Sequence, residues 1–210
     1  RSAGQGVSLT NTDIAVLRFR GHRIPRALAG LRGHDGGDSA GIDAAVEGAR
    51  RVVVLGDDAD LAAVLTRLLR IERLDVEVAH LSGWHGARRA LTAAAQRIPL
   101  IRDESGTVLV GSAFWLPPGA ESVLYGEAVV DDEVLFDGPV TGVRIEPTES
   151  MPGLRAAVLS GRMRPRRWVT GRAVQLGTTG ARMVRDGVSA PREVRRAAFY
   201  RHITGWLRVR

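Results

Sequence analysis

Three carboxylates lie close together after a short apolar run in the first half of the chain. Asp57, Asp58 and Asp60 follow the stretch Val52–Leu55 and Gly56. Carboxylate oxygens accept hydrogen bonds from the free N–H groups at the start of a helix, and oxygen is also the ligand that Mg²⁺ prefers. A phosphate cradle needs glycines and bare N–H donors, so an anion here would need a bridging cation. Two interpretations stay open: a heavily capped helix, or a loop that holds a cation and its anionic ligand.

The opposite charge gathers near the C-terminus. Residues 151–210 contain fourteen arginines but only two carboxylates, Asp186 and Glu193, whereas residues 101–150 contain ten carboxylates and two arginines. The two segments neutralise one another only in part, so some guanidinium groups must stay free. We expect an exposed loop around Pro165 that attracts anionic lipid headgroups or another polyanion. Its arginines are Arg162, Arg164, Arg166 and Arg167.

Composition limits the chemistry further. All thirty basic residues are arginine, which is typical of a GC-rich bacterial genome, so their number alone carries little functional weight. The absence of cysteine excludes disulfide bonds, thiolate catalysis and Cys-ligated metals, and it fits a reducing cytoplasm. No apolar run approaches the ~20 residues of a membrane span. We therefore expect a cytoplasmic protein that is at most peripheral to a membrane.

The acidic cluster lies between a predicted strand and a predicted helix. Val52–Leu55 is a β-branched apolar run of the kind that is buried on both faces in a parallel sheet. The residues after it place leucine and valine at spacings of three and four, which predicts a helix with one buried face. Residues 74–79 alternate between apolar and polar, which predicts a second strand. Together these segments predict a βαβ unit with a right-handed crossover.

The remaining chain divides into three parts. Residues 1–45 form a poorly defined N-terminal segment, with a strand-like run at 14–19 and a glycine and aspartate loop at 30–41. Residues 46–105 form the α/β lobe. Residues 106–210 form a β-rich lobe with a basic tail, because short strands alternate with Gly, Pro and Asp-Gly turns. Two of these turns are predicted at 177–180 and at Asp186-Gly187.

Two motifs resemble the diacylglycerol kinase and NAD kinase superfamily. Leu55-Gly-Asp-Asp-Ala59 is similar to the GGDGT loop of that family, in which Gly56 and Asp57 match and the other three positions depart. Asp186-Gly187-Val188 resembles the Asp-Gly-Glu motif of the family's lipid kinases. The order of the lobes is also the same. The resemblance implies a two-lobe fold, with a short parallel sheet followed by an antiparallel β-rich lobe.

The same resemblance implies a function. Gly56 and Asp57 would contact ATP phosphates, Asp57 would hold Mg²⁺, and Asp186 would be the general base in phosphoryl transfer to a lipid hydroxyl. The alternative is a non-catalytic two-lobe binding or regulatory module that has lost nucleotide binding. Nucleic-acid binding ranks lower, because no RRM, KH or helix-turn-helix signature is present. The sequence leaves open whether the protein is an enzyme and whether it forms a homo-oligomer.

Overall fold

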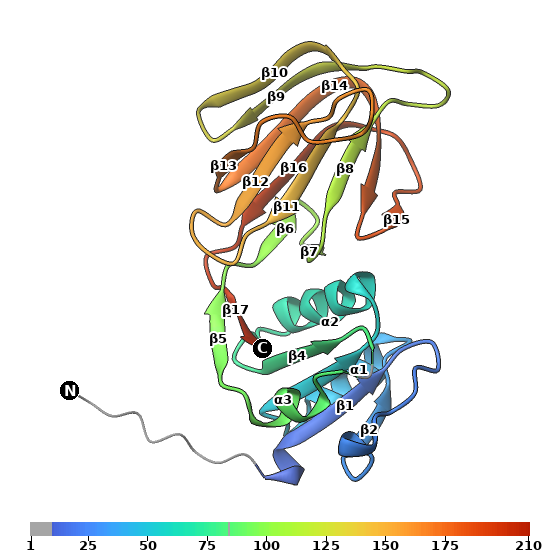
Figure 1. Cartoon of the computed structure of the whole chain (residues 1–210), viewed down its shortest axis with the longest axis vertical. Helices are drawn as coiled ribbons and strands as arrows, with labels where there is room; N and C mark the ends of the chain where they lie inside the picture. Colours follow the sequence, from blue (N-terminus) through green and yellow to red (C-terminus); the bar gives the residue numbers. More distant parts are fainter. Residues whose placement is uncertain (1–9, 84) are drawn as a thin grey trace, which may run out of the picture.

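Two β-sheets of different kinds form the two lobes of the chain (Figure 1). The computed structural model describes residues 10–83 and 85–210. The first sheet has six strands in the order β2-β1-β3-β4-β17-β5, in which only the last pair is antiparallel. The second sheet has eleven antiparallel strands. The predicted architecture, an α/β lobe followed by an antiparallel β-rich lobe, is confirmed.

Helices cover both faces of the first sheet. The strands are β1 (Ile14–Arg18), β2 (Arg32–Asp35), β3 (Arg51–Leu55), β4 (Glu77–Leu81), β5 (Ala95–Ile98) and β17 (Trp206–Val209). The helices are α1 (Ser39–Val46), α2 (Asp58–Arg70) and α3 (Ala87–Thr92), with 3₁₀ turns η1 (Asn11–Asp13) and η2 (Arg26–Leu28). Because strand side chains alternate between faces, Val52 and Val54 pack under α1 and α2, whereas Val53 faces η2 and α3.

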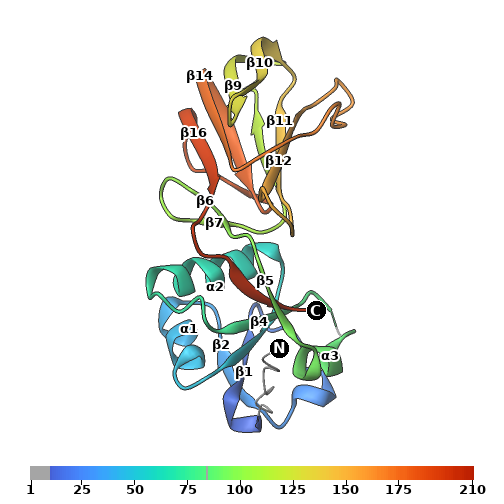
Figure 2. The same ribbon diagram turned by 90° about the vertical axis from the view of Figure 1, so that its left-hand side faces the viewer.

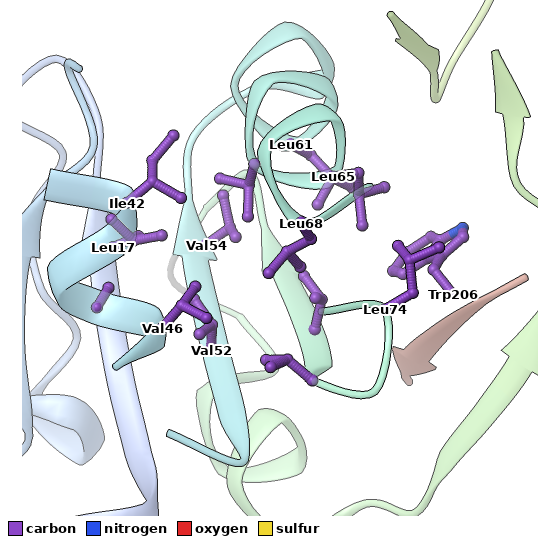
Figure 3. Close-up of a cluster of buried hydrophobic side chains, with 14 of the residues drawn as sticks. Leu17, Ile42, Val46, Val52, Val54, Leu61, Leu65, Leu68, Leu74 and Trp206 are labelled. Carbon is purple, nitrogen blue, oxygen red and sulfur yellow. The ribbon is translucent and has the colours of Figure 1, made fainter. Parts of the chain in front are cut away.

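The predicted βαβ unit is present as β3, α2 and β4. β3 and β4 pair in parallel, with Val53 opposite Ala79. The buried face of α2 includes Leu61, Leu65 and Leu68, which lie over β3 in Figure 3. The second strand begins later than predicted, because a turn in which Val76 N donates to Arg73 O precedes it.

The N-terminal segment is more regular than its sequence indicates. The glycine-rich stretch predicted as a loop contains β2 and the first residues of α1. β2 is an edge strand with mostly exposed side chains, so it lacks an apolar signal. Asp38 caps α1 by accepting from Gly41 N at 2.8 Å. A Cβ at Gly41 would lie 1.8 Å from Asp35 O, so this glycine allows a close approach of helix and strand.

The second lobe is built from strands β6 to β16. Their bounds are β6 (Ile101–Asp103), β7 (Val108–Leu109), β8 (Ala113–Leu116), β9 (Leu124–Val130), β10 (Glu133–Val140), β11 (Val143–Pro147), β12 (Leu154–Val158), β13 (Val169–Gly171), β14 (Ala173–Arg185), β15 (Val188–Ser189) and β16 (Val194–Arg201). The core contains Trp115 and Phe199, whose ring centroids lie 6.1 Å apart. The predicted series of short strands is present, although strands that are not consecutive in the chain pair with each other, such as β8 with β11 and β14.

One long strand replaces a predicted turn. β14 runs through residues 177–180, where the sequence predicts a break. Its first part pairs with β9 and β16 and its last part with β8 and β15, and the register shifts between Gly177 and Ala181. The glycines therefore mark the change of partners within a strand and not a reversal of the chain.

The chain returns to the first lobe at its end. Residues 206–209, which the sequence analysis assigns to the β-rich lobe, form β17 between β4 and β5. Trp206 is buried beside Leu74 in the core under α2 (Figure 3). Two connections therefore link the lobes: the segment from β5 to β6 and the segment from β16 to β17 (Figures 1 and 2).

Candidate functional site

The acidic loop is a doubly capped helix start. Asp60 N donates to Asp57 Oδ1 at 3.0 Å, and Asp57 N donates to Asp60 Oδ2 at 2.9 Å. These two bonds form a capping box at the N-terminus of α2. A Cβ at Gly56 would lie 2.4 Å from Asp60 Oδ2, so the glycine makes room for the capping carboxylate. Of the two interpretations of the acidic loop, a capped helix is therefore the one that Asp57 and Asp60 adopt.

An arginine from the β1–β2 connection covers this loop. The Arg20 guanidinium pairs with Asp57 and lies 3.1 Å from Asp60 Oδ1. Burial acts to raise the pKa of Asp57, but the hydrogen bonds from Asp60 N and Arg20 outweigh it and the pKa is lowered. Both carboxylates thus pair with one cation that the chain itself supplies.

Asp186 lies across the lobe boundary from the acidic loop. It begins the two-residue turn between β14 and β15, where Asp186 and Gly187 have φ of 47° and 80°. Its carboxylate accepts from the backbone N–H groups of Val110, Gly111 and Ser112 at 3.0, 2.7 and 3.1 Å. Asp186 N donates back to Ser112 O at 2.9 Å. The residue therefore ties the turn to the connection between β7 and β8.

Asp58 lies opposite Asp186 at Gly111. A Cβ at Gly111 would lie 2.4 Å from Asp58 Oδ2 and 3.3 Å from Asp186 Oδ1. Burial raises the pKa of Asp186, the three N–H donors lower it, and the Asp58 charge raises it further, with a net upward shift. The structure thus brings Asp186 close to Asp58 and not to Asp57, which faces Arg20.

A cavity of about 210 Å³ lies between the lobes on the other side of Asp58. His80 reaches it from β4, and its Nε2 lies 2.9 Å from Gly56 O. Arg208 of β17 pairs with Glu149 of the second lobe at 2.7 Å. Apolar walls complete the cavity, and its lining includes Leu61, Ile98, Pro99, Leu109, Val110 and Trp206. Acidic side chains from both lobes and a basic side chain from the first lobe therefore line this cavity.

The predicted basic loop lies away from this cavity. Residues 159–165 form a short ladder in which Ser160 N donates to Arg164 O at 2.9 Å. Arg167 pairs with Glu133 at 2.8 Å, whereas the described residues offer no ion pair to Arg162 or Arg164. Figure 2 shows the connection between β12 and β13 projecting from the second lobe. The four predicted arginines are thus not part of the site at the lobe boundary.

The sequence analysis assigned no functional role to Arg20, His80, Gly111 or Arg208. Each of them reaches the site from a different element, at sequence distances that no local pattern encodes. Arg20 is one of thirty arginines, and its partner Asp57 lies 37 positions away. The glycine of the Gly111-Ser112 pair after β7 is a weak sequence signal for the site, because glycine often marks a position where another group approaches the backbone closely.

Two of the three carboxylates of the acidic loop are already engaged within the chain. Asp57 and Asp60 already accept helix N–H groups and pair with Arg20, so their oxygens lack the open arrangement of a cation ligand set. Within residues 10–83 and 85–210, no group of three or more His, Asp or Glu side chains could hold a metal ion.

The helices of the described residues are all too short or too polar to cross a membrane.

Solved structures of other proteins show the same fold. The chain is similar to a diacylglycerol kinase from Bacillus anthracis strain Sterne, with a TM-score of 0.72 and 9% identity, over 94% of this chain and 96% of that one. It is also similar to an NAD kinase from Archaeoglobus fulgidus solved in complex with ATP, with a TM-score of 0.64 and 12% identity, over 94% and 93%.

No family model matches the sequence, and no curated protein matches it. The resemblance that the two motifs predict is confirmed at the level of the fold: the chain has the two-lobe fold of diacylglycerol kinases and NAD kinases. At identities this low, the likeness defines the architecture and not the reaction.

Proposed function

We propose that this protein is a non-catalytic relative of the kinases with this fold, a two-lobe module that binds a small polar ligand between its lobes. The observation that carries the proposal is the Arg20 guanidinium, which bridges Asp57 and Asp60 at the loop that resembles the nucleotide loop. A guanidinium paired with both carboxylates supplies the positive charge that a cation bridging to a phosphate would otherwise supply.

Electrostatics favour this proposal over nucleotide binding. The start of α2 carries three carboxylates where a phosphate loop presents N–H groups. One negative charge placed about 4 Å from another near a protein surface is repelled by roughly 4 kcal/mol. Arg20 offsets part of this repulsion, but it is exposed and already shared by two acids. A nucleotide would have to displace it or add a further cation.

The cavity between the lobes indicates the class of ligand. Asp58 and His80 can bind a hydroxyl or ammonium group, and the Arg208–Glu149 pair adds both charges at the opposite wall. Leu61, Leu109 and Trp206 would contact a short apolar portion. At about 210 Å³ the space is smaller than a drug-sized pocket. A small amino alcohol or polyol fits this chemistry.

Two measurements on the native protein test the proposal. Calorimetric titration with Mg-ATP should give the same result for the native protein and for Asp57→Ala, because the loop contributes no nucleotide binding, and a Kd below about 0.1 mM that Asp57→Ala abolishes would overturn the loss of nucleotide binding at this loop. Ligand-observed NMR with ethanolamine, serinol and glycerol should detect binding of at least one compound. Asp58→Asn should weaken that binding, whereas Asp132→Asn, the same charge change at an exposed turn, should not.

A second candidate is phosphoryl transfer from ATP to a lipid hydroxyl. The observation that favours it is the approach of Asp58 and Asp186 at Gly111, where burial raises the pKa of Asp186 above its ordinary value. If this activity exists, Asp57→Ala should abolish Mg-nucleotide affinity while the fold persists, because a helix cap is worth only about 1 kcal/mol. Phosphorylated product in a mixed-lipid assay would support this candidate, and its loss in an Asp186→Asn variant that remains folded at the assay temperature would assign the base.

We also propose that the loop between β12 and β13 contacts an anionic lipid surface. Arg162 and Arg164 flank Met163, which is 47% exposed. An exposed apolar side chain between two free guanidinium groups suits a headgroup boundary, where the charges meet phosphates and the methionine enters the acyl edge. The chain's excess of positive charge is largest in the segment that contains this loop.

A further inference from the structure

A second basic surface lies on the face of the first sheet opposite to α2. There, η2 and α3 pack against each other and against the strands. Leu28 of η2 and Ala87 and Ala90 of α3 are buried in the same apolar cluster. Because these side chains point inward, the neighbouring Arg26, Arg88 and Arg89 are directed to the surface. All three arginines are exposed.

The three arginines line one hollow of about 740 Å³. Its other lining residues are small or apolar, namely Pro25, Ala27, Gly86 and Ala87. A second hollow of about 390 Å³ continues from it, shares Gly86 and Arg89, and reaches Arg208 and Arg210. No Asp or Glu is among the lining residues of either hollow.

These three guanidinium groups have no partner in the described part of the chain. Many other arginines pair with carboxylates, including Arg51, Arg67 and Arg185. For Arg26, Arg88 and Arg89, residues 10–83 and 85–210 offer no ion pair or side-chain hydrogen bond. Like charges around one concave surface reinforce each other's field and attract counter-anions.

The surface is also held rigidly. Arg51, which is only 3% exposed, donates to the carbonyl oxygens of Ala90, Leu91 and Ala93 at 3.0, 2.7 and 2.8 Å. Its Nε donates to Glu77 at 2.7 Å. The C-terminal end of α3 is therefore fixed to β3 and β4, so Arg88 and Arg89 stand on a helix that cannot easily move away from Arg26.

We infer that this hollow binds a small molecule that carries two or more phosphate groups. Guanidinium groups bind phosphate oxygens through paired N–H donors, and several of them around one hollow match a ligand with several phosphates. The volume is within the range of small-molecule sites and suits a nucleotide-sized ligand more than an extended polymer. The first hollow shares no lining residue with the acidic loop or with the cavity between the lobes, whereas the second hollow shares His80 and Arg208 with that cavity.

Inorganic tripolyphosphate is a suitable probe, because it carries the charge without a base or sugar. Calorimetry at ~0.15 M salt, where charges interact only over about 8 Å, should detect its binding to the native protein. A variant with Arg26→Gln, Arg88→Gln and Arg89→Gln should bind at least tenfold more weakly. The matched control changes Arg162, Arg164 and Arg166 to Gln, which removes the same net charge elsewhere and should lower affinity less than threefold.

Two further readouts make the result decisive. Amide chemical shifts should change at residues 86–90 and not at 160–168 when tripolyphosphate is added to the native protein. Equal weakening in both triple variants, or no binding by the native protein, overturns the inference. Tighter binding of a single-stranded oligonucleotide than of tripolyphosphate, lost equally in both variants, also overturns it, because the arginines would then act as general charge. If the first triple variant unfolds, Arg89→Gln alone tests the same site.

Discussion

At the scale of single residues, the three carboxylates of the acidic loop make different contacts. Asp57 and Asp60 cap α2 and pair with Arg20, whereas Asp58 is left to face Gly111 and the cavity between the lobes. Asp186 accepts three backbone hydrogen bonds, so its first role is to hold the polypeptide around residues 110–112. Asp186, to which the family resemblance assigns the general base, thus also stabilises the backbone of residues 110–112.

Replacing Asp186 should therefore destabilise the fold. Asp186→Ala leaves three part-buried N–H groups without their acceptor, and we expect the free energy of unfolding to fall by about 2–4 kcal/mol. Asp186→Asn retains one acceptor oxygen and should cost about half as much. Urea unfolding monitored by tryptophan fluorescence measures both. An unchanged midpoint in Asp186→Ala would show that the three hydrogen bonds contribute nothing to stability.

The ion pair of Arg20 predicts a pH dependence. The pKa of Asp57 is lowered in the folded state from an ordinary value of 3.8. A lowered pKa means that this pair stabilises the native state above that value and that the contribution is lost as the pH falls through the folded pKa. Native protein should thus be more stable than Arg20→Gln at pH 7, and the difference should shrink below about pH 3.8. Thermal melts across pH 2.5–7 give this difference, and Arg23→Gln is the control. A gap that stays constant with pH would contradict the role of Asp57.

At the scale of elements, the two arginine-rich surfaces stand on different supports. The η2–α3 surface rests on buried alanines and on Arg51. The loop between β12 and β13 rests on a short backbone ladder between residues 158 and 166. The first is concave and suits a small ligand, whereas the second projects and suits an extended surface.

The projecting loop should bind anionic vesicles. Replacement of Arg162, Arg164, Arg166 and Arg167 by Gln should reduce co-sedimentation with phosphatidylserine vesicles at low salt, because each exposed arginine near such a surface contributes about 1 kcal/mol. Binding by the native protein should also fall steeply with salt. The Arg26, Arg88 and Arg89 triple variant is the control and should still bind. Native protein that remains in the supernatant at low salt would remove the case for a membrane contact.

At the scale of the whole molecule, the last strand joins the lobes. β17 pairs with β4 and β5, and Arg208 and Arg210 both pair with Glu149 of the second lobe. Trp206 connects this strand to the core under α2 and also lines the cavity between the lobes. The cavity between the lobes therefore depends on the correct docking of the C-terminal residues.

Trp206→Ala should weaken the first lobe selectively. A buried tryptophan reduced to alanine costs about 3–5 kcal/mol through lost burial and the cavity that remains. Native-state hydrogen exchange should accelerate in β4 and β5, whereas β12 in the second lobe should change little. Trp168→Ala, on a half-buried side chain stacked on Arg155 in the second lobe, is the control. Uniform acceleration in both lobes would mean that they unfold as one unit.

Local patterns were sufficient for much of this architecture. The apolar run of β3, the spacing of leucines in α2 and the Asp-Gly pair at residues 186–187 each encode a structure within a few neighbouring residues, and each element is present. The capping role of Asp57 also follows from a spacing of three residues. Backbone dihedral preferences and the burial of one face act over such short distances, so a sequence alone determines them.

Tertiary structure decided what these elements do together. Arg20 meets Asp57 across 37 positions, Asp186 meets Gly111 across 75, and β17 inserts beside β4 from the far end of the chain. Edge strand β2 was not predicted because its side chains are mostly exposed, and the continuity of β14 was not predicted because its last part pairs with β8, about 70 positions earlier in the chain. Strand order and lobe packing arise from the summed burial of the whole chain, which no local window of residues contains. The sequence therefore determined the acidic loop, and only the fold decided that its counter-charge is an arginine of the same chain.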